Sequence, residues 1–338
     1  MQALTMRVQY CFFVNRRIRA IFSFAVSILA SLLSNSLYAQ DYPAKPIRII
    51  VPSAIGGSPD LIARIIAPRL SQGLGQQIII ENRPGAGGAP AMASVAKSTG
   101  DGYTLMFATP GALIIAAKLM ANAGYDPVKS FAPVSLLITA PFLLVANSEV
   151  SANSLKDLID LARLKPGTLN YGTSNGTLPH LSGYVFMAAT GVSITPVTYK
   201  SISQAYLDLT AGTIQLMFEQ VALFEQGIRS GKIKALAVAS SKRHPKLPDV
   251  PTANEAGLPG FEVLSWAGLL APKDTPTEII KRLNFEIVST LRSKEVQESL
   301  LNLGIDPIGS TPEQFAKFIN IETEKWTSAI NASGAKAD

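Results

Sequence analysis

Cysteine and histidine are scarce in this chain of 338 residues, which has one cysteine, Cys11, and two histidines, His180 and His244. Cys11 lies in an N-terminal stretch that we expect to be removed. The mature chain would then have no disulfide, no thiol nucleophile and no cysteine-based metal site. Two histidines far apart in the sequence argue against a zinc site. We therefore expect neither a metal nor a cofactor.

Acidic residues are absent from the first 39 residues, which carry Arg7, Arg16, Arg17 and Arg19. The apolar run that follows, residues 20–33, is too short for a comfortable transmembrane helix. This pattern predicts a signal peptide over residues 1–39, cleaved after Ala39, and export to the bacterial periplasm. A retained membrane anchor is the alternative interpretation.

Excess charge is also absent once the leader is removed, because 26 basic residues then face 24 acidic ones, a net charge of +2. The chain has no dense basic stripe, so nucleic acid is not expected as a partner. The remaining 299 residues are long for a single core and suit two α/β lobes.

The most informative stretch runs from Ile47 to Leu70. Residues 47–51 are apolar and β-branched, as in a buried strand. Gly56 and Gly57 permit a tight turn, and Ser58 is a suitable N-cap for a helix that Pro59 and Asp60 begin. Strand, glycine loop and helix in this order expose free N–H groups that suit an anion. An ordinary turn without a ligand is the alternative.

Strands and helices alternate along the rest of the chain, which predicts βαβ units and parallel sheet. We expect Pro141 to separate two strands, Ser154 to cap a helix, and a helical stretch over residues 277–303 to break near Ser293. Thr311 and Gln314 form a capping-box pattern. The predicted lobes meet near Pro141 and Trp266. Lobe 1 comprises residues 40–141 and 265–310, and lobe 2 comprises residues 142–264 and 311–338.

One hydrolase motif is present, because residues 172–176 match G-x-S-x-G between a strand and a helix. Ser174 would be the nucleophile of a secreted serine esterase, with His244 and a later acid completing a triad. His244 is followed by Pro245 in an expected loop, and the strand before the motif is short. The competing hypothesis is a clamp, in which both glycine loops bind one anion at the carboxyl ends of parallel strands. No nucleotide-binding fingerprint fits either loop.

Long matches in order show that the sequence resembles the Bug-type solute-binding proteins of tripartite tricarboxylate transporters. They lie at residues 42–48, 81–88, 101–105, 169–172, 179–181, 199–200, 247–252 and 255–257. The resemblance implies an α/β, two-lobed periplasmic binding protein fold of the type II-like, Venus-flytrap kind. It also implies that the protein is not an enzyme. In that family a small carboxylate lies in the cleft between the lobes and passes to membrane subunits of the transporter.

We expect the protein to act as a monomer that binds a small organic acid. The resemblance implies that backbone amides of the two glycine loops hold this acid. The expected ligand-binding residues are Ser53, Ala54, Ile55, Gly56, Gly57, Thr109, Thr173, Ser174, Asn175, Gly176, Thr177, His180, Tyr199, Ser201, Glu219 and Gln220.

Three of these residues depart from the family pattern. Ser53 replaces an aromatic residue, Ser201 a glycine, and Glu219 the commoner aspartate. The ligand's identity therefore stays open, and so does the possibility of an orphan receptor that signals rather than feeds a transporter.

Overall fold

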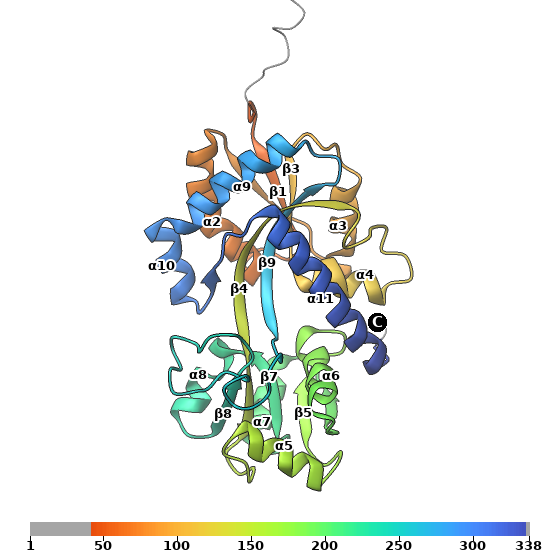
Figure 1. Ribbon diagram of the computed structural model, residues 1–338, viewed down its shortest axis with the longest axis vertical. Helices are drawn as coiled ribbons and strands as arrows, with labels where there is room; N and C mark the ends of the chain where they lie inside the picture. The colour runs from red at the N-terminus through yellow and green to blue at the C-terminus, as the bar shows by residue number, and fades with distance from the viewer. Residues whose placement is uncertain (1–41, 336–338) are drawn as a thin grey trace, which may run out of the picture. The chain divides into compact units, whose positions relative to one another are not determined.

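The computed structural model describes residues 42–335, of which those from Lys45 onward form one compact unit (Figure 1). The predicted signal peptide and Cys11 lie outside the described residues. Within residues 42–335, no helix is both long and apolar enough to cross a membrane.

The strands form one sheet in the order β2-β1-β3-β9-β4-β7-β5-β6, and β8 and β10 also pair with β4. Their bounds are β1 (Ile47–Val51), β2 (Ile78–Asn82), β3 (Thr104–Ala108), β4 (Phe131–Asn147), β5 (Asn170–Thr173), β6 (Thr195–Thr198), β7 (Leu216–Gln220), β8 (Ile233–Val238), β9 (Leu264–Pro272) and β10 (Asp306–Pro307).

Helices follow most strands and cover the sheet. The α-helices are α2 (Ser58–Leu74), α3 (Ala89–Ala96), α4 (Ala116–Leu119), α5 (Leu155–Leu164), α6 (Leu178–Thr190), α7 (Ile202–Thr210), α8 (Val221–Arg229), α9 (Thr277–Arg292), α10 (Lys294–Asn302) and α11 (Pro312–Ser333). Two short helical segments, η1 (Ala86–Gly88) and η2 (Gly111–Ile115), precede α3 and α4.

The parallel pairing expected from the sequence is present in two places. Strand β1 lies parallel to β2 and β3, and β5 lies parallel to β6 and β7. The strands between these groups, β4 and β9, pair antiparallel with their neighbours. The sheet is therefore mixed, with a parallel group at each end.

Strand β4 corrects the expectation that Pro141 separates two strands. It runs unbroken for 17 residues through Pro141. Pro141 pairs with Leu264 of β9, and the next residue, Phe142, pairs with Gln220 of β7. Because the proline lies where β4 exchanges one partner for another, its missing N–H does not interrupt a continuous ladder.

Several helix boundaries follow the capping rules. The side chain of Ser154 accepts a hydrogen bond from the Asp157 N–H, and the capping box of Thr311 and Gln314 is present. Ser293 separates α9 from α10, as predicted. The prediction for Ser58 was wrong by one residue, because Gly57 is the N-cap and Ser58 is the first helical residue.

Helix α11 packs along β4 and contacts η2, α4 and α6 (Figure 1). Its Phe315 lies edge-on to Trp266 of β9, with ring centroids 5.9 Å apart. Gly268 permits this approach, because an added Cβ would lie 2.1 Å from the Phe315 ring. The last helix is therefore fitted directly against a strand that joins the two parallel groups.

A buried carboxylate joins α11 to β9. Glu322 Oε2 accepts hydrogen bonds from Trp266 Nε1 at 2.9 Å and Trp326 Nε1 at 2.8 Å, and Lys325 pairs with Oε1. Lys325 Nζ also donates to the carbonyl oxygen of Glu262 at 3.2 Å. Glu322 and both indoles are buried. The charge is thus paired and both indole N–H groups are satisfied, as burial requires.

Replacing Glu322 by alanine should destabilise the fold by about 2–4 kcal/mol, because two buried indole N–H groups lose their acceptor and Lys325 loses its partner. Urea unfolding measures the loss. The exposed Glu324 on the same helix supplies the control, since Glu324→Ala should change stability by less than about 0.5 kcal/mol. Equal effects of the two substitutions would contradict this role for Glu322.

Candidate functional site

The first glycine loop follows β1, where this strand ends beside β2. Val51 pairs with Asn82 at the last position of the parallel ladder, so the loops after both strands leave the same edge of the sheet. Gly56 has φ +82°, which favours glycine, whereas Gly57 has an ordinary φ of −69°. The turn therefore depends on Gly56 for its backbone conformation.

A buried aspartate fixes this loop. Asp60 accepts hydrogen bonds from the N–H of Gly56 at 2.9 Å, from Arg64 Nε at 2.9 Å and from Asn82 Nδ2 at 3.0 Å. Asn82 Nδ2 also donates to the carbonyl oxygen of Ser53 at 3.2 Å. The bonds from Arg64 and Gly56 lower the pKa of Asp60 to about 2. One ionised side chain thus ties the loop to α2 and β2.

The second glycine loop, after β5, is braced in a similar way. Gly176 has φ +67°, and its N–H donates to His180 Nδ1 at 3.3 Å. The Thr177 hydroxyl donates to the carbonyl oxygen of Ser174 at 2.6 Å. His180 is buried and packs edge-on against Tyr184, and burial lowers its pKa. The neutral imidazole is therefore favoured as an acceptor for the Gly176 N–H.

The ends of β5 and β6 meet beside this loop. Tyr199 donates its N–H to the carbonyl oxygen of Thr173 at 2.8 Å, and Ser174 Oγ donates to the carbonyl oxygen of Tyr199 at 3.0 Å. The Tyr199 hydroxyl donates to Asp208 at 2.8 Å. Burial, and to a smaller extent this hydrogen bond, raise the pKa of Tyr199 to about 12. Thr173 Oγ1 is buried without a partner among the described residues.

Glu219 and Gln220 end β7 at the same edge, next to β5. Glu219 is partly buried, and one of its oxygens accepts the N–H of Gln220 at 2.8 Å. Burial raises the pKa of Glu219 above its ordinary value.

Two further predicted residues lie at the starts of helical segments. Ser201 is the N-cap residue of α7. Thr109, which follows β3, accepts the N–H of Ala112 on its Oγ1 at 3.3 Å.

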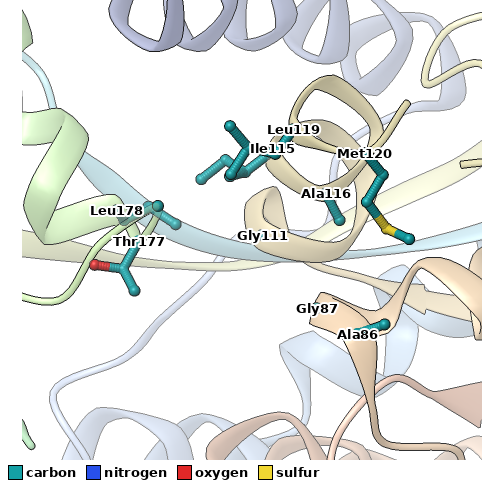
Figure 2. A pocket seen from close by; sticks show the side chains of 10 residues that line it. Ala86, Gly87, Gly111, Ile115, Ala116, Leu119, Met120, Thr177 and Leu178 are labelled. Atoms are coloured by element: carbon teal, nitrogen blue, oxygen red, sulfur yellow. The ribbon is translucent and has the colours of Figure 1, made fainter. Parts of the chain in front are cut away.

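A cavity of about 520 Å³ opens beside the second loop (Figure 2). Its volume lies in the usual range for small-molecule sites, about 300–1,000 Å³. Figure 2 shows side chains of η2 and α4 on one side and of residues 177–178 on the other. The lining residues are Ala86, Gly87, Gly111, Ile115, Ala116, Leu119, Met120, Gly176, Thr177 and Leu178.

Three of the sixteen predicted residues line one of two cavities, and the other thirteen line neither. Gly176 and Thr177 line the larger one, whereas Gln220 lines a smaller cavity of about 140 Å³ together with Ser58 and His244. Residues 53–57 line neither. The binding roles of all sixteen residues stay predictions.

The esterase alternative was wrong, because Ser174 and His244 have separate surroundings. The Ser174 hydroxyl donates to a carbonyl oxygen and not to an imidazole. His244 is buried, lines the smaller cavity and accepts the Lys246 N–H on Nδ1 at 3.2 Å. Burial lowers its pKa, and no hydrogen bond among the described residues joins His244 to Ser174, as a general base would require.

Sequence reasoning missed the wall that η2 and α4 provide. No role was assigned from the sequence to Ile115, Ala116, Leu119 or Met120. One signal was available, because residues 85–88 and 109–111 follow the carboxyl ends of β2 and β3, where ligands bind in such sheets. The spacing of apolar residues in a short helix cannot by itself distinguish a cavity wall from core.

Among residues 42–335, no group of three or more His, Cys, Asp or Glu side chains is arranged to hold a metal ion. The larger cavity is lined by backbone, apolar side chains and one hydroxyl. None of its lining residues has a charged side chain that could bind a metal ion.

An α/β sheet with braced glycine loops beside a small-molecule cavity is the arrangement of a solute-binding protein. Residues 62–335 match the sequence pattern of the tripartite tricarboxylate transporter family receptor, and the chain belongs to this family. The match covers most of the chain, including both parallel groups of strands except β1.

Relatives support the same assignment. The chain is 37% identical over 300 residues to protein BugT of Bordetella pertussis, covering 88% of this chain and 92% of BugT. It is 38% identical over 308 residues to a protein encoded in the tcbD-tcbE intergenic region of Pseudomonas sp. strain P51, covering 90% and 91% of the two chains.

Solved structures show the fold. An R. palustris protein solved with adipate is 36% identical, with a TM-score of 0.69, and 88% of this chain and 99% of that one are covered. MatC from Rhodopseudomonas palustris, solved with bound malate, is 34% identical, with a TM-score of 0.66 and coverage of 86% and 100%.

These findings confirm the two-lobed periplasmic binding protein fold and the receptor role expected from the sequence. The family and its structural neighbours are solute-binding proteins and not enzymes. The chain is accordingly a solute-binding receptor of a transporter family.

Replacing Asp60 by asparagine should destabilise the protein by about 1–3 kcal/mol at pH 7, because the charge that holds Arg64 and the Gly56 N–H is lost. The folded-state pKa of Asp60, about 2, lies below its ordinary value. Its contribution is therefore complete above about pH 4 and is lost as the pH falls toward about 2. Urea unfolding at several pH values measures the gap between wild type and Asp60→Asn.

The exposed Asp249 provides the control, and Asp249→Asn should change stability little at any of these pH values. A gap for Asp60→Asn that is as large near pH 2.5 as at pH 7 would contradict the ionised network.

Proposed function

We propose that this receptor captures a small organic carboxylate in the cleft beside its glycine loops and delivers it to the membrane subunits of a tripartite tricarboxylate-type transporter. The observation that carries the proposal is the cavity of about 520 Å³ lined by the second glycine loop. Relatives with 34% and 36% identity were solved with malate and adipate, both of which are carboxylates.

The contacts to the anion follow from which N–H groups the loops leave available. The N–H groups of Gly56, Gly57 and Gly176 already donate to Asp60, Ala54 and His180. These glycines therefore shape the loops, and the bound anion accepts hydrogen bonds from N–H groups of adjacent residues. In the first loop we assign this role to the N–H groups of Ala54 and Ile55, which have no acceptor among the described residues.

Closure of the two lobes would bring these N–H groups and the second loop onto one ligand. Such a movement would bury apolar surface of Ile55, whose side chain in the first loop is 77% exposed. Ser174, Tyr199 and Glu219 lie at neighbouring strand ends, and we assign them to the far wall of the same site, where the hydroxyls of Ser174 and Tyr199 already donate within the protein.

We also propose that the protein acts in the periplasm as a monomer. The leader of residues 1–39 would export the protein to the periplasm, where it would act as a monomer. The chain would carry no cofactor, and its partners would be the ligand and the membrane subunits.

Replacing Gly176 by valine should lower carboxylate affinity at least about tenfold. Valine would strain a backbone at φ +67°, and its Cβ would lie 3.0 Å from Leu119 Cδ1 in the cavity wall. Ser174→Ala should be milder and cost about 0.5–1.5 kcal/mol of binding, because it removes the one neutral hydrogen bond that holds the loop to the Tyr199 carbonyl oxygen. Isothermal titration calorimetry with malate, adipate, benzoate and phenylacetate measures both effects.

Gly191 provides a matched control for the strain alone. It has φ +68° at the end of α6, with nothing within 4 Å of an added Cβ. Gly191→Val should lower stability and leave affinity unchanged, with circular dichroism confirming that each variant folds. If folded wild-type protein binds none of the tested carboxylates, the proposed function is wrong.

A further inference from the structure

We infer that the ligand of this receptor is a monocarboxylate with an apolar body, and that this body lies in the 520 Å³ cavity against α4 and the start of α6. The inference rests on the proposed carboxylate-binding function and specifies the substrate class. The anion itself stays outside the apolar part, at the glycine loops.

The cavity wall is apolar on both sides. Ile115, Leu119 and Met120 line it from η2, α4 and the residue after α4, and Leu178 lines it from the first position of α6. Figure 2 shows these side chains on opposite sides of the open space, with Ala86 and Gly87 below. None of the ten lining residues carries a charge. A ligand body placed here gains by removing apolar surface from water.

The one polar side chain at the cavity, that of Thr177, is already engaged, and so is the N–H of Gly176. Thr177 has the only hydroxyl among the lining side chains, and this hydroxyl donates to the carbonyl oxygen of Ser174. The N–H of Gly176 donates to His180. A second carboxylate placed in this cavity would exchange water for apolar side chains without a cationic partner, which is strongly unfavourable for an ionised group. The cavity therefore selects against di- and tricarboxylates that must bury both ends.

Two glycines set the dimensions of the cavity. An added Cβ on Gly176 would lie 3.0 Å from Leu119 Cδ1, and one on Gly87 would lie 3.3 Å from the Cβ of Ala116. The loops therefore approach α4 as closely as their backbones permit, and the remaining space lies between apolar side chains. Met120 suits an aromatic ring, because its polarisable thioether makes favourable contacts with ring edges.

Calorimetry on the mature chain tests the inference with two sets of probes. The monocarboxylates are benzoate, phenylacetate and isovalerate, and the dicarboxylates are succinate, malate and adipate. The tightest monocarboxylate should bind at least about tenfold more tightly than the tightest dicarboxylate. Leu119→Ala and Leu178→Ala should each weaken that monocarboxylate about fivefold to 50-fold, because each removes buried apolar contact.

Leu207 on α7 is the matched control, since its side chain is 57% exposed and lines neither cavity. Leu207→Ala should leave every affinity unchanged. A dicarboxylate that binds most tightly, or a monocarboxylate affinity that is indifferent to Leu119→Ala and Leu178→Ala, would overturn the apolar-body inference and leave the carboxylate receptor intact. If folded protein binds no carboxylate at all, both the inference and the proposed function are wrong.

Discussion

The antiparallel pairing of β4 with β9 is the constraint on which the rest of the structure depends. These strands carry the sheet from one parallel group to the other, with Thr139 opposite Trp266. Each parallel group releases its loops at the carboxyl ends of its strands, and the larger cavity draws residues from loops of both groups. Glu322 reinforces the pairing, because it binds the Trp266 indole from α11.

Polar side chains in this receptor fix the backbone of the two glycine loops. In the proposed site, the ligand contacts these loops and not the polar side chains that fix them. Asp60 and Asn82 fix the first glycine loop, and His180 fixes the second. Glycine N–H groups that sequence patterns would assign to an anion are thereby committed to the protein. In the proposed site, the specificity for a ligand body comes from apolar side chains on α4 and α6 rather than from charged groups.

Much of the fold could be predicted from the sequence because its signals are local. The cap at Ser154, the capping box at Thr311 and the break at Ser293 each depend on a few adjacent residues. Pro141 was misinterpreted because its effect depends on which strands lie beside β4, and residues 264 and 220 are distant in sequence. The Asp60 network and the cavity wall at Leu119 likewise join distant segments. The sequence pattern placed Gly176 in a glycine loop, but it could not predict that the Gly176 N–H donates to His180.

We infer that the ligand in this cleft is a monocarboxylate with an apolar body. The most direct test is mass spectrometry of the ligand released by denaturing protein purified from its native periplasm, because the protein has there been exposed to its native solutes. The released ligand should be a small acid with one carboxylate and an aromatic or branched hydrocarbon body, present in near-stoichiometric amount. A polycarboxylate recovered in that amount would contradict the inference.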